Sequence, residues 1–261
     1  MADGADELIE RFLATGRVPP GFRGWPGEAA SRRAEATSTL QNILCRIVAW
    51  RARRAPLRLG APPVDVAGRV RDRTRRAVEG LFDPPDAAQV LAELPARVRV
   101  VTAASYPTLV DALPLDRAWD LANLLLDHMG APTLSDDVPR LDALCCGGTA
   151  YLIPAAFTPR PDADVVLHEC VHVLLDSRRG PFGLAPADLP LLAVPVAHHE
   201  TAAYAVEAWA CAERAPGLDP ATWGRLAAED ARVDRAALSD LLERARRESW
   251  AGLRAGLAAL R

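Results

Sequence analysis

The sequence contains no lysine, so all 31 residues counted as lysine or arginine are arginines. Alanine is abundant as well, and we interpret this bias mainly as a coding preference rather than as chemistry. The 34 acidic residues give a formal net charge of -3, and half of all residues are apolar. This composition is ordinary for a soluble globular protein, and 261 residues are enough to bury a substantial core.

Cysteine is scarce too, with five residues and no C-x-x-C spacing. The odd number and the spacing indicate neither a disulfide framework nor a cysteine zinc site. Cys145 and Cys146 are adjacent and precede two glycines. We interpret them as small buried side chains before a turn rather than as redox-active or metal-binding groups.

Long apolar runs are also missing. No stretch approaches the length of a membrane span, and residues 1–7 are acidic, with no apolar signal core behind a basic segment. We therefore expect a cytoplasmic protein that has no membrane partner.

One segment is strongly basic. Twelve arginines lie between Arg32 and Arg76, against only three acidic residues. Such a segment can contact nucleic acid or an acidic partner, but this one has a single aromatic residue, Trp50, and no recognisable binding motif. We interpret it as a solvated helix face and do not expect nucleic acid as a partner.

Apolar periodicity predicts a mostly helical chain. Residues at steps of three and four predict helices over 1–16, 28–54 and 113–129, and another that carries Val66 and ends near Leu81. Alternating apolar and charged residues predict a strand over 97–102. One or two amphipathic helices are expected between Pro220 and Arg261.

The most informative stretch covers residues 165–176 and contains the pattern H-E-x-x-H inside an apolar helix. His168 and His172 are four residues apart, so their imidazoles can converge on one cation, which we predict to be zinc. Glu169 is rotated by about 100° on the helix and lies beside the ion, where it can take a proton from water. Asp176 lies on the ligand face and can hydrogen-bond an imidazole.

A short strand, residues 147–154, comes before this helix and is closed by Pro154, which suits an edge strand or the end of a strand because it has no N–H to give to a neighbour. We expect the free edge of this strand to face the metal. An extended peptide could then pair with that edge, as substrates do in many clefts.

The motif supplies two ligands, whereas a catalytic zinc usually has three. A predicted helix that begins near Ala197 offers the third. Glu200 and Glu207 share a face with Tyr204 by steps of three and four residues, and His198 and His199 lie just before them. The residues alone leave Glu200, Glu207 and the two histidines as alternatives.

The order of these motifs resembles the gluzincin metallopeptidases, and among them the ImmA/IrrE-like proteins. The resemblance covers roughly residues 147–210, in which Thr149-Ala150-Tyr151-Leu152-Ile153 precedes the H-E-x-x-H pattern and Glu200-Thr201-Ala202-Ala203 follows it. It implies an α+β, mostly helical fold, with a zincin-like core and a small sheet beside the active-site helix. Residues 1–95 would form an N-terminal mostly helical region, and residues 96–261 a zincin-like metal-binding domain with C-terminal helices.

The resemblance also assigns roles. His168, His172 and Glu200 would bind zinc, and Glu169 would be the general base. The chain departs from the family where many gluzincins have an aspartate four residues after the ligand glutamate, because Tyr204 stands there. That tyrosine can instead donate to an oxyanion.

The resulting prediction is a zinc-dependent metallopeptidase that hydrolyses a peptide bond with metal-activated water and is site-selective on a protein or peptide partner. One alternative is an iron and 2-oxoglutarate-dependent peptide-modifying oxygenase, because two histidines and one further ligand also suit Fe²⁺. His198 or His199 would then complete the site, and Arg178 or Arg179 would hold the co-substrate. The other alternative is a non-catalytic binding protein on a zincin scaffold.

Overall fold

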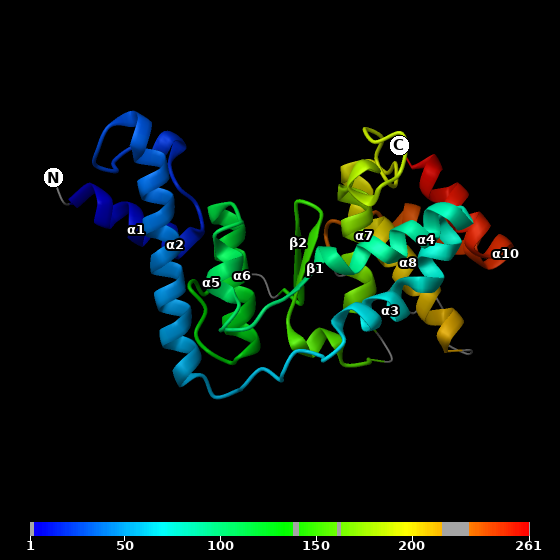
Figure 1. The fold of residues 1–261 in the computed structure, drawn as a ribbon, viewed down its shortest axis with the longest axis horizontal. Helices are drawn as coiled ribbons and strands as arrows, with labels where there is room; N and C mark the ends of the chain where they lie inside the picture. The colour runs from blue at the N-terminus through cyan, green and yellow to red at the C-terminus, as the bar shows by residue number, and fades with distance from the viewer. Residues whose placement is uncertain (1–2, 138–140, 161–162, 216–229, 261) are drawn as a thin grey trace. The chain divides into compact units, whose positions relative to one another are not determined.

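The computed structural model describes residues 3–137, 141–160, 163–215 and 230–260 (Figure 1). It is mostly helical with one small mixed three-stranded sheet, which confirms the predicted α+β class. The main elements in chain order are α1 Asp3–Thr15, α2 Ala29–Arg54, α3 Val66–Leu81, α4 Pro84–Glu93, β1 Val98–Val100, α5 Tyr106–Val110, α6 Leu115–His128, β2 Ala143–Cys146, β3 Thr149–Leu152, α7 Val165–Asp176, α8 His199–Arg214 and α10 Arg235–Ala259.

Contacts divide the chain into two compact units that alternate along the sequence. The first contains Met1–Ala61, Val100–Leu144 and Ile153–Ala155, and the second contains Pro62–Arg99, Cys145–Leu152 and Ala156–Arg261. The predicted boundary between an N-terminal region, residues 1–95, and a metal-binding domain, residues 96–261, stays a prediction. Within the described ranges, no helix is long and apolar enough to cross a membrane.

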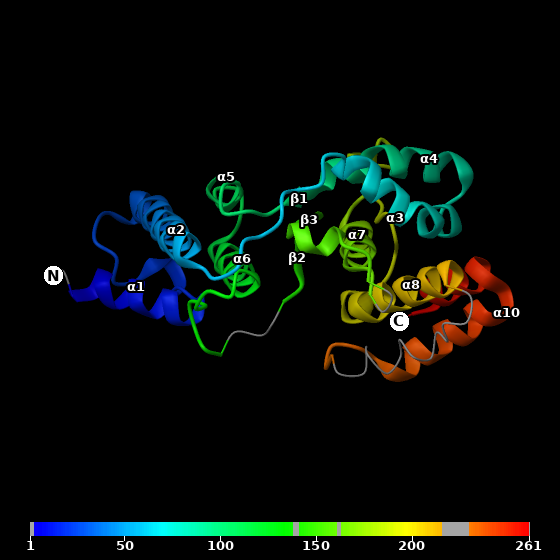
Figure 2. The same ribbon diagram turned by 90° about the horizontal axis from the view of Figure 1, so that it is seen from below.

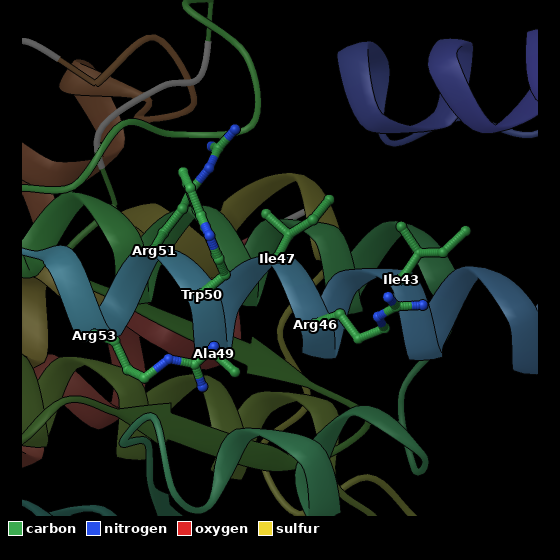
Figure 3. Close-up of a pocket in the computed structure, with 7 residues that line it drawn as sticks. All are labelled: Ile43, Arg46, Ile47, Ala49, Trp50, Arg51 and Arg53. Atoms are coloured by element: carbon green, nitrogen blue, oxygen red, sulfur yellow. The ribbon is translucent and has the colours of Figure 1, made fainter.

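The first unit is built on α2, which packs against α6 and α5. A fully buried stripe at four-residue steps forms the inner face of α2, and its members are Ala36, Leu40, Leu44, Val48 and Ala52. The outer face carries Trp50 among arginines and lines an open cavity of ≈ 680 Å³ (Figure 3). The described residues that line this cavity include none of the predicted site residues.

In the second unit, α7 packs against α8 and α3, and α8 packs against α10 (Figure 2). Helix α7 is apolar on nearly all sides, so it is buried between its neighbours rather than exposed along one face. Strand β3 contacts α7, which places the small sheet beside the helix that carries the H-E-x-x-H motif.

The sheet corrects one prediction. Its strand order is β1-β3-β2, so β3 lies in the centre and has no free edge for a substrate. Gly147 and Gly148, both with positive φ, connect β2 to β3 in a two-residue turn. Positive φ at both positions is the mark of a type I′ hairpin, which keeps the two strands paired. The expected free edge at residues 147–154 was therefore wrong, and β2 is the edge strand of this hairpin. Pro154 instead follows the end of β3, which is the other position that the proline suits.

Close packing of α3 on α10 leads to a stability prediction. A Cβ atom added at Gly80 would lie 2.3 Å from the Trp250 ring. Although alanine favours a helix more than glycine, we expect Gly80→Ala to lower the free energy of unfolding by about 1–3 kcal/mol, the usual cost of overpacking. Urea unfolding measures this change. Gly60→Ala is the control, because a Cβ there meets nothing within 4 Å. Equal stabilities for the two variants would contradict the packing of α3 on α10.

Candidate functional site

The site begins at the N-terminal end of α7, where Asp164 caps the helix. Its carboxylate accepts a hydrogen bond from the Leu167 backbone N–H at 3.1 Å and is almost completely buried. Two arginines from other helices neutralise it, Arg73 of α3 at 3.2 Å and Arg214 of α8 at 2.5 Å. One buried carboxylate thus ties three helices together around the start of the motif helix. Asp162, the other cap considered from the sequence, lies outside the described residues.

The imidazoles of His168 and His172 converge as their spacing predicts. Their Nε2 atoms lie 3.2 Å apart. The Oε2 atom of Glu200, in the first turn of α8, lies 3.5 Å from Nε2 of His168 and 3.4 Å from Nε2 of His172. These three residues form the one group of possible metal ligands found in the described part of the chain.

The dimensions of this group fit a tetrahedral zinc ion. Zinc bonds to nitrogen and oxygen of about 2.0–2.1 Å imply separations of about 3.3–3.4 Å between neighbouring ligand atoms in a tetrahedron. The three measured separations, 3.2, 3.4 and 3.5 Å, surround that value. The donor set of two imidazoles and one carboxylate is also one that zinc accepts in catalytic sites.

Glu207 occupies a different position from Glu200. Its Oε2 lies 3.1 Å from Nδ1 of His168, and its Oε1 accepts the backbone N–H of Asp164. Because the carboxylate is an acceptor, Nδ1 of His168 carries a proton, so the neutral ring has its lone pair on Nε2, where a metal can bind. Glu207 thus orients a possible ligand instead of being one in this arrangement.

The remaining histidines considered from the sequence do not join the group. His199 directs Nδ1 to Asp176 at 3.2 Å and Nε2 to the Val194 carbonyl oxygen at 3.1 Å. Asp176 therefore contacts an imidazole, but that of His199 and not of His168 or His172. His198 ends the short 3-10 helix that leads into α8 and is not in the metal-binding group.

The charges around His168, His172 and Glu200 favour a cation at the centre of the group. Burial alone would lower the pKa of His168, but hydrogen bonds to Glu200 and Glu207 outweigh it and raise the pKa to about 10. Burial would raise the pKa of Glu200, but the two histidines hold it far below its usual range. Metal binding requires deprotonated ligands, so a bound metal would replace this proton on His168 and supply the positive charge in its place.

Two further side chains suit acid–base chemistry. Burial raises the pKa of Glu169, against the lowering effect of His168 and His172. A carboxylate with a raised pKa is a better proton acceptor near neutral pH. Tyr204 contacts His168 edge to face, with ring centroids 4.6 Å apart. Burial, followed by nearby Asp230, raises its pKa to about 12, so its hydroxyl stays protonated and can donate a hydrogen bond.

One pair of site residues was missed from the sequence. Nη1 of Arg232 forms an ion pair with Oε1 of Glu200 at 2.5 Å, and Nε and Nη2 of the same guanidinium donate to the two oxygens of Asp230. No local motif marks these residues, because their place beside Glu200 depends on how the chain after α8 returns to that helix. The sequence itself shows only an acid, Asp230, and an arginine two residues later, Arg232.

The network at Asp164 generates a prediction about stability. Asp164→Asn keeps the size of the side chain but leaves Arg73 and Arg214 without their shared carboxylate. We expect the free energy of unfolding to fall by about 3 kcal/mol, since removing one partner of a buried ion pair leaves uncompensated charge. Asp83→Asn is the matched control, because Asp83 forms an exposed pair with Arg254. Similar denaturation midpoints for both variants would show that the buried network does not hold the helices.

The contact of Glu207 generates a prediction about metal affinity. Glu207→Gln offers an amide to Nδ1 of His168 and so disturbs the tautomer that exposes Nε2. We expect zinc to bind about 10–100-fold more weakly, as when outer partners of ligands are lost. Titration against a chromophoric chelator measures this affinity. Glu213→Gln on the same helix is the control, because Glu213 binds Trp250 and Arg76 and no site residue. An unchanged affinity in Glu207→Gln would contradict the orienting role.

Comparisons with protein-family models, with curated proteins and with solved structures found no match for this chain. Similarity therefore assigns neither a family nor an activity. The conclusion about the site rests on its geometry, which is a group of His168, His172 and Glu200 able to hold a metal ion, carried by α7 and α8.

Proposed function

We propose that the protein is a zinc-dependent metallopeptidase. The observation that carries the proposal is the triangle of donor atoms formed by His168, His172 and Glu200, whose sides match a tetrahedral zinc site. Glu169 is held within the same motif beside this triangle. The combination of two histidines, a carboxylate ligand and a neighbouring base is the one that the resemblance to gluzincins implies, with the same residues in the same roles.

The residues of the chain would divide the reaction between them. A bound zinc ion would supply Lewis acidity, polarising the substrate carbonyl and making water more acidic. Glu169 takes the proton from the attacking water and returns it to the leaving amine. Tyr204 keeps its proton and donates a hydrogen bond to the carbonyl oxygen as negative charge develops there. Glu207 keeps His168 oriented throughout.

Strand β2 supports a peptide as the substrate. It is the edge strand of the hairpin, and Cys145 within it lies 3.8 Å from Asp176 at the end of α7. Burial, followed by the nearby charge of Glu169, raises the pKa of the Cys145 thiol, so this strand runs close to the proposed base. An extended peptide can add to such an edge by backbone hydrogen bonds. The resemblance to ImmA/IrrE-like proteins favours site-selective cleavage of a protein partner.

An iron enzyme is the second candidate, because two histidines and one carboxylate also form the ligand set of many non-haem Fe²⁺ oxygenases. The other parts of that reading have less support. Glu200, rather than His198 or His199, meets the two imidazoles. Arg178 donates to the Asp188 carbonyl oxygen, and Arg179 pairs with Asp86 at 2.7 Å, so both arginines hold loops. A scaffold without catalysis has no need of Glu169, which is present and half-buried beside the ligands.

Metal content tests the proposal first. Protein purified without added metal should contain near-stoichiometric zinc, and Glu200→Ala should lose it. The double variant His198→Ala/His199→Ala should retain zinc, because neither histidine belongs to the donor triangle. Stoichiometric iron in the unaltered protein, or zinc lost only from the double variant, would contradict this assignment and direct attention to oxidative chemistry.

Catalysis is tested by incubating the zinc-loaded protein with a peptide library and detecting new termini by mass spectrometry. Glu169→Gln should keep its zinc but lower the cleavage rate by about 100–10,000-fold, the usual contribution of a general acid–base group. The control is Glu213→Gln, which changes a carboxylate outside the site on α8. Cleavage that persists in Glu169→Gln, or no cleavage by the zinc-loaded protein, would contradict peptidase activity while leaving the metal site intact.

A further inference from the structure

The two oxygens of Glu200 face different partners. Oε2 lies 3.5 Å and 3.4 Å from the Nε2 atoms of His168 and His172, where a shared metal would bind. Oε1 instead forms an ion pair with Nη1 of Arg232, at 2.5 Å. A carboxylate that binds a metal through both oxygens would have to give up this ion pair.

The guanidinium that holds Oε1 is itself held. Asp230 accepts from Nε of Arg232 at 3.0 Å and from Nη2 at 2.6 Å, which is the two-pronged arrangement that fixes the plane of a guanidinium. The turn that carries this pair is joined to α8, because the Asp234 N–H donates to Oγ1 of Thr201 at 2.9 Å. Thr201 is completely buried and follows Glu200 directly. Arg232 is therefore positioned relative to Glu200 even though much of its side chain faces solvent.

We propose that Arg232 is a positioning residue that restricts Glu200 to one-oxygen coordination. By occupying Oε1, it leaves only Oε2 for the metal and keeps a further coordination position open for water and substrate. A catalytic zinc needs such a position, whereas a structural zinc does not. The inference rests on the proposed metal site, but it concerns coordination number and does not depend on which bond the enzyme cleaves.

Lysine cannot fully replace this arginine. Its ammonium can donate to Oε1, but it has no planar fork to bind both oxygens of Asp230. Methionine has similar length and offers no donor at all. Comparing Arg232→Lys with Arg232→Met therefore separates the effect of a cationic donor beside Oε1 from the effect of side-chain volume.

Cobalt(II) in place of zinc reports coordination number through its visible absorption, which is intense for four ligands and weak for five or six. We expect the cobalt-loaded unaltered protein to give the intense spectrum. Arg232→Met should lose it, because Oε1 becomes free to bind the metal, and Arg232→Lys should recover it in part. Circular dichroism of the metal-free forms should show both variants folded at the temperature at which the spectra are recorded. Arg244→Met is the control, since Arg244 pairs with Asp240 on α10, one turn away on an exposed surface.

The outcomes separate this inference from the proposed function. A full-intensity cobalt spectrum in Arg232→Met would overturn the role of Arg232 and leave the metal site and the peptidase proposal standing. An equal loss of intensity in Arg244→Met would overturn it as well, because the effect would then not be specific to Glu200. If the unaltered protein bound neither cobalt nor zinc, the metal site and the role of Arg232 would fail together.

Discussion

The register of α8 against α7 is the constraint on which the site depends, and Glu207 sets it. One of its oxygens binds the backbone N–H of Asp164 before α7, and the other binds Nδ1 of His168 one turn later. Glu200 lies seven residues, or about 10 Å of helix rise, before Glu207 on the same face. With Glu207 fixed on one side of the His168 ring, Glu200 is brought to the Nε2 side. A slip of α8 by one residue would rotate both carboxylates away from α7.

The carboxylates of Asp164 and Glu200 are tolerated in this apolar environment because each has a cationic partner. Asp164 is shared by Arg73 and Arg214, and Oε1 of Glu200 is held by Arg232. Charges without such partners would be expensive in a helix as apolar as α7. The same pairing restricts the side chains, so their rotamer entropy is lost during folding and not again when an ion or substrate binds. The site is therefore organised before any ion or substrate arrives, which is the condition under which electrostatic catalysis is most effective.

Local patterns made part of this arrangement predictable from sequence. The periodicity of α2, α3 and α7 gave their extents to within a few residues, because each buries a continuous stripe or a whole surface. The convergence of His168 and His172 follows from helix geometry alone. In contrast, α4 and α5 were missed because they are short and have prolines in their first turns, and β2 was missed because four residues with two cysteines carry no alternation. The edge position assigned to β3 was wrong because strand order depends on non-local pairing, here with β1, about fifty residues earlier.

The choice between Glu200 and Glu207 shows most clearly where sequence reasoning stops. Both are glutamates on one face of one helix, and their spacing is compatible with either as a ligand. What separates them is the half of the His168 ring that each one meets: Nδ1 for Glu207 and Nε2 for Glu200. Since the second histidine also presents Nε2, only the carboxylate on that side can complete a site with both rings. The ligand is thus selected by the tautomer of His168, and that tautomer is selected by the carboxylate that is not a ligand.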